Sequence, residues 1–105
     1  MNRFNRNILI AGLAFALSGP ALADGGDPEK MRRIAEAASL ISLEQATQKA
    51  LAAKPGTIIE VELDDRKWPQ GWDYEFEIID ANGKEWDVDI DAKTGKVRKV
   101  KSDWF

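Results

Sequence analysis

The chain has 105 residues, with 15 basic and 18 acidic side chains, and it contains neither histidine nor cysteine. Without these two residue types there is no thiol nucleophile, no imidazole base and no zinc site of the usual ligands. An enzyme would have to work with carboxylates alone. We therefore expect a protein with no catalytic residues, no metal site and no cofactor.

The first 23 residues have the layout of a secretory signal peptide. Arg3 and Arg6 form a positive start, Ile8 to Leu17 is apolar, and Ala21-Leu22-Ala23 is a small-x-small cleavage site. The apolar run is shorter than the about 20 residues that a membrane-spanning helix needs. The sequence predicts export to the periplasm, cleavage of residues 1–23, and no membrane insertion afterwards.

The charge left after cleavage narrows the choice of partner. The remaining 82 residues carry 13 basic and 18 acidic side chains, a net charge of −5, and are enough for one domain. Such a domain repels nucleic acid and anionic lipid, whose binding needs a cationic surface. We therefore expect no nucleic-acid partner. The core must hold the fold without disulfides, and four tryptophans are the expected means.

Helical signals come first along the chain. Asp27-Pro28-Glu29 is a helix start with an N-cap and a proline at the first helical position, and Ser42-Leu43-Glu44-Gln45 is a capping box. Pro55-Gly56 ends the helical pattern. Two helices, or one helix with a kink near Ser42, fit equally well. We divide the chain into the signal peptide, a helical extension over residues 24–40 and a domain over residues 41–105.

From Thr57 the hydrophobic period changes to two, which is typical of half-buried strands. The alternating apolar residues are Ile59, Val61 and Leu63, then Trp72, Tyr74, Phe76 and Ile78, then Trp86, Val88 and Ile90. Asn82-Gly83 is a hairpin signal, and Lys93-Thr94-Gly95 turns the chain into a short basic strand over Lys96 to Lys101. The pattern predicts an α+β fold in which a helix or helix pair packs on one face of a four-stranded antiparallel sheet.

The stretch from Asp87 to Arg98 also begins like a calcium-binding EF-hand loop, because aspartates stand at positions 87, 89 and 91. An EF-hand needs glycine at the sixth position and glutamate at the twelfth, where this chain has Ala92 and Arg98. The stretch is therefore predicted to be a strand followed by a hairpin turn.

The solvent face of the predicted sheet is acidic. Its carboxylates are Glu60, Glu62, Glu75, Glu77, Asp87 and Asp89. One interpretation is cross-strand charge pairing with the basic last strand, which serves solubility. The other is a platform for weak divalent cations or a cationic peptide. The first is favoured, because exposed runs of like charge are usually solvated faces.

The loop between the first two strands combines tryptophan with cations, as binding hot spots do. It reads Arg66-Lys67-Trp68-Pro69-Gln70-Gly71-Trp72. Trp72 is in phase with the core residues after it, whereas Trp68 lies in the turn. Either Trp68 folds back as a lid over the core, or it contacts a partner together with Arg66, Lys67 and Trp72.

The combined pattern resembles a PepSY domain. Ile41-Ser42-Leu43-Glu44-Gln45-Ala46 and Ile59-Glu60-Val61-Glu62-Leu63 resemble its first half, and Tyr74 to Ile78 with Trp86 to Val97 resemble its second. The resemblance implies a helix on an antiparallel sheet outside the cytoplasm, without catalytic residues. It also implies a role in binding and restraining peptidases, or in signalling. We expect a periplasmic binding module whose partner is an envelope protein, either a peptidase or a sensor protein.

Overall fold

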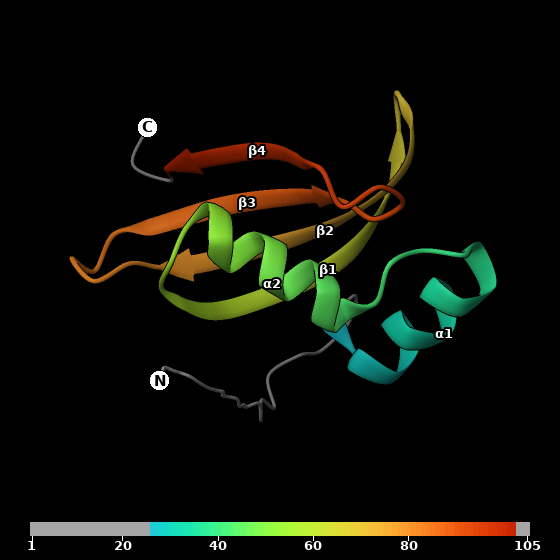
Figure 1. Cartoon of the computed structure of the whole chain (residues 1–105), viewed down its shortest axis with the longest axis horizontal. Helices are drawn as coiled ribbons and strands as arrows, with labels where there is room; N and C mark the ends of the chain where they lie inside the picture. The colour runs from blue at the N-terminus through green and yellow to red at the C-terminus, as the bar shows by residue number, and fades with distance from the viewer. Residues whose placement is uncertain (1–25, 103–105) are drawn as a thin grey trace.

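The computed structural model describes residues 26–102, so the predicted signal peptide lies outside the described residues. Two helices precede four strands, as Figure 1 shows. The elements are α1 (Pro28–Ala38), α2 (Leu43–Ala53), β1 (Thr57–Lys67), β2 (Gln70–Ile79), β3 (Glu85–Asp91) and β4 (Val97–Ser102). The predicted α+β fold is confirmed, with the helices packed against the antiparallel sheet.

The two helices are separate because each has its own start. The Asp27 carboxylate accepts a hydrogen bond of 3.0 Å from the Glu29 N–H at the start of α1, and Pro28 occupies its first position. Helix α1 ends at Ser39 in the left-handed conformation. At α2, Ser42 and Gln45 exchange both bonds of the capping box. Of the two arrangements that the sequence left open, the helix pair is the one found.

The sheet follows the order β1-β2-β3-β4, and every neighbouring pair is antiparallel. Gly83 and Gly95 each adopt a φ of 81° in the turns before β3 and β4, a conformation that glycine takes without strain. In the second turn the Asp91 carboxylate accepts hydrogen bonds from the Lys93 and Thr94 N–H groups. The EF-hand-like stretch is therefore a strand and a hairpin turn.

The core lies between the sheet and the helices. Tyr74, Phe76 and Ile78 of β2 and Val88 and Ile90 of β3 are almost fully buried. Fully burying one such side chain contributes about 1.5–3 kcal/mol. Helix α2 contacts β2, β3 and β4, while α1 lies beside the start of α2 on the β1 side of the sheet (Figure 1). Within residues 26–102, the helices thus cover one face of the sheet.

Small residues let α2 approach the sheet closely. Ala46 and Ala50 have no exposed surface. The buried Tyr74 hydroxyl donates a hydrogen bond of 2.8 Å to the Ile41 carbonyl, just before α2 begins. This bond satisfies a polar group that would be costly to bury alone. It also fixes the segment between the helices to the sheet.

Two expectations about the core are wrong in part. The three described tryptophans do not form its centre: Trp72 and Trp86 are half-buried and Trp68 is exposed, and the central aromatics are Tyr74 and Phe76. The fourth, Trp104, lies outside the described residues. Ile59 is also exposed, although the period-two pattern placed it inside. The register of β1 against β2 shifts between Ile58 and Glu60, which moves Ile59 out of phase with Val61.

Candidate functional site

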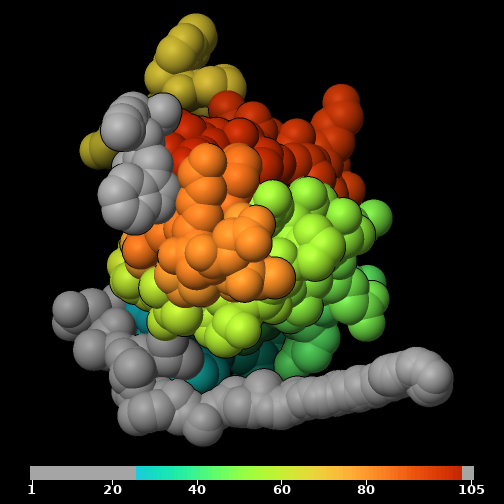
Figure 2. Space-filling model, turned by 90° about the vertical axis from the view of Figure 1, so that its left-hand side faces the viewer, coloured from blue at the N-terminus to red at the C-terminus, as the bar shows by residue number. Residues whose placement is uncertain are grey.

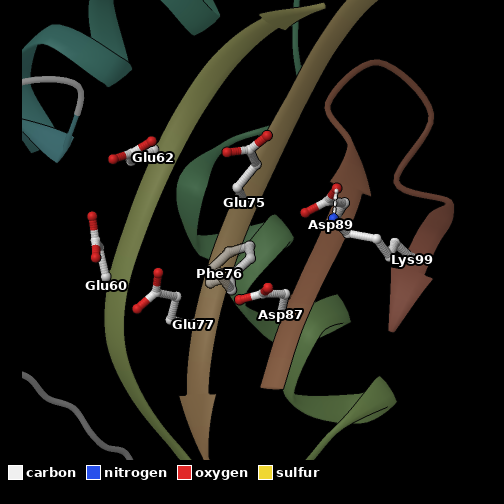
Figure 3. Close-up of a pocket in the computed structure, with 8 residues that line it drawn as sticks. All are labelled: Glu60, Glu62, Glu75, Phe76, Glu77, Asp87, Asp89 and Lys99. Atoms are coloured by element: carbon white, nitrogen blue, oxygen red, sulfur yellow. Dashed lines mark ion pairs between the residues drawn. The ribbon is translucent and has the colours of Figure 1, made fainter. Parts of the chain in front are cut away.

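The face of the sheet opposite α2 carries the six predicted carboxylates, and Figure 3 shows them together. We call this surface the acidic face; its residues are Glu60, Glu62, Glu75, Glu77, Asp87 and Asp89. The strand register aligns them in two rows across three strands. One row is Glu60, Glu77 and Asp87, and the other is Glu62, Glu75 and Asp89. Like charges directly opposite one another destabilise a sheet, so this arrangement has an energetic cost.

A shallow hollow of about 170 Å³ lies on the acidic face. Its cation is Lys99 of β4, whose Nζ is 3.5 Å from the Asp89 carboxylate (Figure 3). The positive charge in this hollow therefore lies on its β4 side, whereas the carboxylates of β1 and β2 face one another.

The crowding of carboxylates affects β2, where the pKa values of two glutamates are raised. Burial, together with the charges of Asp64 and Asp89, raises the pKa of Glu75 to about 7. Burial also raises the pKa of Glu77 to about 7, together with the charge of Glu60 and a hydrogen bond with Glu85. Both carboxyls therefore change charge near neutral pH, well above the usual range for glutamate.

Beyond these two rows, a buried aspartate is paired with two arginines. Asp73 is 2 % exposed, and its two carboxylate oxygens accept hydrogen bonds from Arg66 at 2.7 Å and from Arg98 at 2.9 Å. Arg66 also reaches Asp91 at 3.5 Å. Burial raises the pKa of Asp73, and the two guanidinium groups act against that rise. We call these four residues the arginine clasp; it joins all four strands.

The four predicted contact residues at the β1–β2 hairpin do not share one exposed surface. Trp68 is 89 % exposed, and Lys67 beside it is exposed as well. Trp72 instead packs against the core, and the Arg66 side chain is only 12 % exposed in the clasp. Trp68 is therefore not a lid over the core. The surface at the hairpin tip consists of Lys67, Trp68, Pro69 and Gln70, all exposed.

The clasp holds this tip in place. The Arg66 Nε donates a hydrogen bond of 3.0 Å to the Pro69 carbonyl, so the guanidinium spans the turn from beneath. A Cβ at Gly71 would collide with the Arg66 side chain, so glycine at this position gives the arginine room to fold across. The exposed Trp68 thus lies in a turn that Arg66 links to the buried Asp73 carboxylate.

Sequence reasoning missed the clasp because it assigned Arg66 to the loop. A signal was present: Arg66 has the same parity along β1 as Glu60 and Glu62, which places it on the acidic face. The same alternation places Asp73 of β2 on this face, whereas Arg98 reaches Asp73 at the irregular register of β4, which the sequence does not show. The contacts of the clasp were missed because most of its residues are far apart in the sequence.

The described residues show neither a metal centre nor a membrane span. Between residues 26 and 102 no three carboxylates are arranged to hold a metal ion. In the same range, no helix has the length and apolar character needed to cross a bilayer.

Comparison with known families decides the relationship. The family model for the peptidase propeptide and YPEB domain, PepSY, matches residues 40–101. The chain belongs to the PepSY family. PepSY domains are typically found outside the cytoplasm, and they are generally non-catalytic modules that regulate or inhibit. No curated protein and no solved structure matches the chain significantly.

Proposed function

We propose that this PepSY protein is a non-catalytic periplasmic module that binds an envelope protein through the tip of the β1–β2 hairpin. The observation that carries the proposal is the 89 % exposure of Trp68. A large aromatic side chain left in water has a cost that burial against a partner removes, and tryptophan is enriched in binding hot spots.

The hydrogen bonds that hold the hairpin tip in place support this role. Arg66 ties the turn to Asp73 and to the Pro69 carbonyl, so little conformational freedom has to be lost when a partner binds. Pre-organisation of this kind raises affinity by lowering the entropic cost of association. Within the class of binding modules, the PepSY match favours a peptidase as the partner, which the module restrains by contact.

The test is affinity capture from periplasmic extract with the wild-type protein and with Trp68→Ala. We expect wild type to enrich a peptidase and the variant to lose it, since truncating a hot-spot tryptophan costs about 2 kcal/mol or more of binding energy. The enriched peptidase is then titrated with purified protein, and its activity should fall with wild type but not with the variant.

A matched control separates the tip from the rest of the surface. Lys30→Ala changes an exposed residue of α1 and should capture as wild type does. Both variants should unfold at the wild-type temperature, because neither residue is in the core. Equal capture by wild type and Trp68→Ala would overturn the hairpin tip as the contact surface. Capture without any effect on peptidase activity would overturn the inhibitory role.

The acidic face supports a second candidate function, a sensory module that binds cations or cationic peptides. The specific observation is the pair Glu75 and Glu77, whose pKa values are both raised to about 7 by burial and by neighbouring carboxylates. A bound polycation would relieve this repulsion. Thermal unfolding with oligolysine, with calcium and with oligoglutamate tests the idea, because a ligand of the folded state raises the melting temperature by mass action. The same temperature in all three solutions would exclude it.

A further inference from the structure

The second edge of the sheet, along β4, is open within the described residues. Strand β4 is last in the sheet order and pairs with β3 alone among residues 26–102. All of its residues from Val97 to Lys101 are exposed. An exposed edge strand presents unpaired N–H and C=O groups, which can take up a further strand from another chain.

The side chains of this edge are apolar on one face and basic on the other. Val97 and Val100 pair with the buried Ile90 and Val88 and thus share the helix-covered face, yet they are 47 % and 42 % exposed. Helix α2 reaches β4 without covering these valines fully. On the other face Lys99 and Lys101 stand opposite Asp89 and Asp87.

The positive charge along this edge favours an acidic segment as the added strand. The segment from Ala92 to Ser102 contains no carboxylate, and its cations include Lys96, Arg98, Lys99 and Lys101. Two copies of β4 would repel each other, which opposes symmetric pairing of the edge with itself. Arg98 and Lys99 already pair with Asp73 and Asp89. An incoming strand with acidic residues on one face and apolar residues on the other would therefore meet Lys96, Lys101 and the half-exposed valines.

The hairpin tip stands at the end of the same edge. In Figures 1 and 2 the gold β1–β2 hairpin rises past β4 on the side where the sheet is open. A strand added along β4 would therefore run toward the tip that carries Trp68. An extended segment that follows the edge would thus lead to the tip.

We propose that the open edge of β4 receives an extended acidic segment of the partner protein as a fifth strand, which leads to Trp68. This inference rests on the proposed function and names the chemistry of the partner segment. The opposite edge, β1, is not equivalent, because it is acidic at Glu60, Glu62 and Asp64 and would repel the same segment.

The experiment measures binding of a labelled peptide of alternating glutamate and valine, about ten residues long, by fluorescence anisotropy with protein made from the full chain. We expect binding that weakens about tenfold in the double variant Lys96→Glu/Lys101→Glu. The control Lys30→Glu/Arg33→Glu makes the same change of charge on exposed residues of α1 and should bind as wild type does. A lysine–valine peptide should not bind at this edge, and amide NMR shifts should appear in β4 rather than in β1.

Three results would overturn the proposal. The first is no binding of the acidic peptide, and the second is equal loss in both charge-reversed variants, which would indicate attraction without a site. The third is self-association that Lys96→Glu/Lys101→Glu abolishes, because the occupant would then be a second copy. Unchanged peptide binding in Trp68→Ala would overturn the continuity with the tip. None of these results affects the capture experiment with Trp68→Ala, so failure of the edge and failure of the proposed function remain distinguishable.

Discussion

Two carboxyls on β2 have pKa values raised well above the ordinary value. Glu75 and Glu77 each stand between carboxylates of β1 and β3, and burial raises the pKa of both to about 7. In the unfolded chain a glutamate has its ordinary pKa of about 4.5. Between these two values the folded state binds more protons than the unfolded state. Stability therefore falls as the pH rises from about 4.5 to about 7.

The first prediction concerns this pH dependence. Glu75→Gln should raise stability at pH 7.5 by about 1 kcal/mol, a value reduced for screening at a partly exposed side chain. It should also flatten the loss of melting temperature between about pH 5 and about pH 7.5. Thermal unfolding across this range measures both effects. Asp65→Asn, at an exposed carboxylate outside the two rows, is the control. A variant as pH-dependent as wild type would contradict the assigned pKa of Glu75.

The second prediction concerns Arg66, which sequence reasoning placed in the contact surface and the structure places in the clasp. Arg66→Ala leaves the buried Asp73 with Arg98 as its remaining ion-pair partner, and should cost about 2–3 kcal/mol of unfolding free energy. Lys67→Ala, one residue further on and exposed, should cost less than about 0.5 kcal/mol. Urea denaturation compares the two variants. Equal costs would mean that the clasp does not stabilise the fold.

At the scale of elements, close approach of α2 to the sheet depends on alanine. Ala50 has no exposed surface, so Ala50→Leu inserts three carbons where there is no space. We expect a loss of about 1–3 kcal/mol from overpacking. The neighbouring Ala52 is exposed on the same helix, and Ala52→Leu should be within about 0.5 kcal/mol of wild type. Denaturant unfolding of the pair tests whether the helix sits as described, and similar stabilities would show that it does not.

The elements themselves were largely predictable from the sequence. Helix starts at Asp27 and Ser42 and the turns at Gly83 and Gly95 follow from local chemistry, which needs no tertiary information. The exposed Ile59 was not predictable, because a bulge depends on how two strands align rather than on either strand alone. The clasp was missed for a related reason: Arg66 and Asp91 are 25 residues apart and meet only when the sheet forms.

For the whole molecule, the two sheet faces have different tasks. One face holds the helices and the core, and the other is the acidic face, where the Lys99 ammonium lies 3.5 Å from the Asp89 carboxylate. Among the described residues, the exposed large apolar side chains are Trp68 at the hairpin tip, Val97 and Val100 on β4, and Ile59 on β1. This separation of stability from recognition is what a binding module requires, since a contact residue can change without loss of the fold.

The most direct test of the central claim is photo-crosslinking in the periplasm, with a photoreactive amino acid at position 68 or, as a control, at position 30 on α1. The account predicts a discrete crosslinked product with an envelope protein from position 68 and none from position 30. No product from position 68, or the same product from both positions, would contradict a role of the hairpin tip in partner binding.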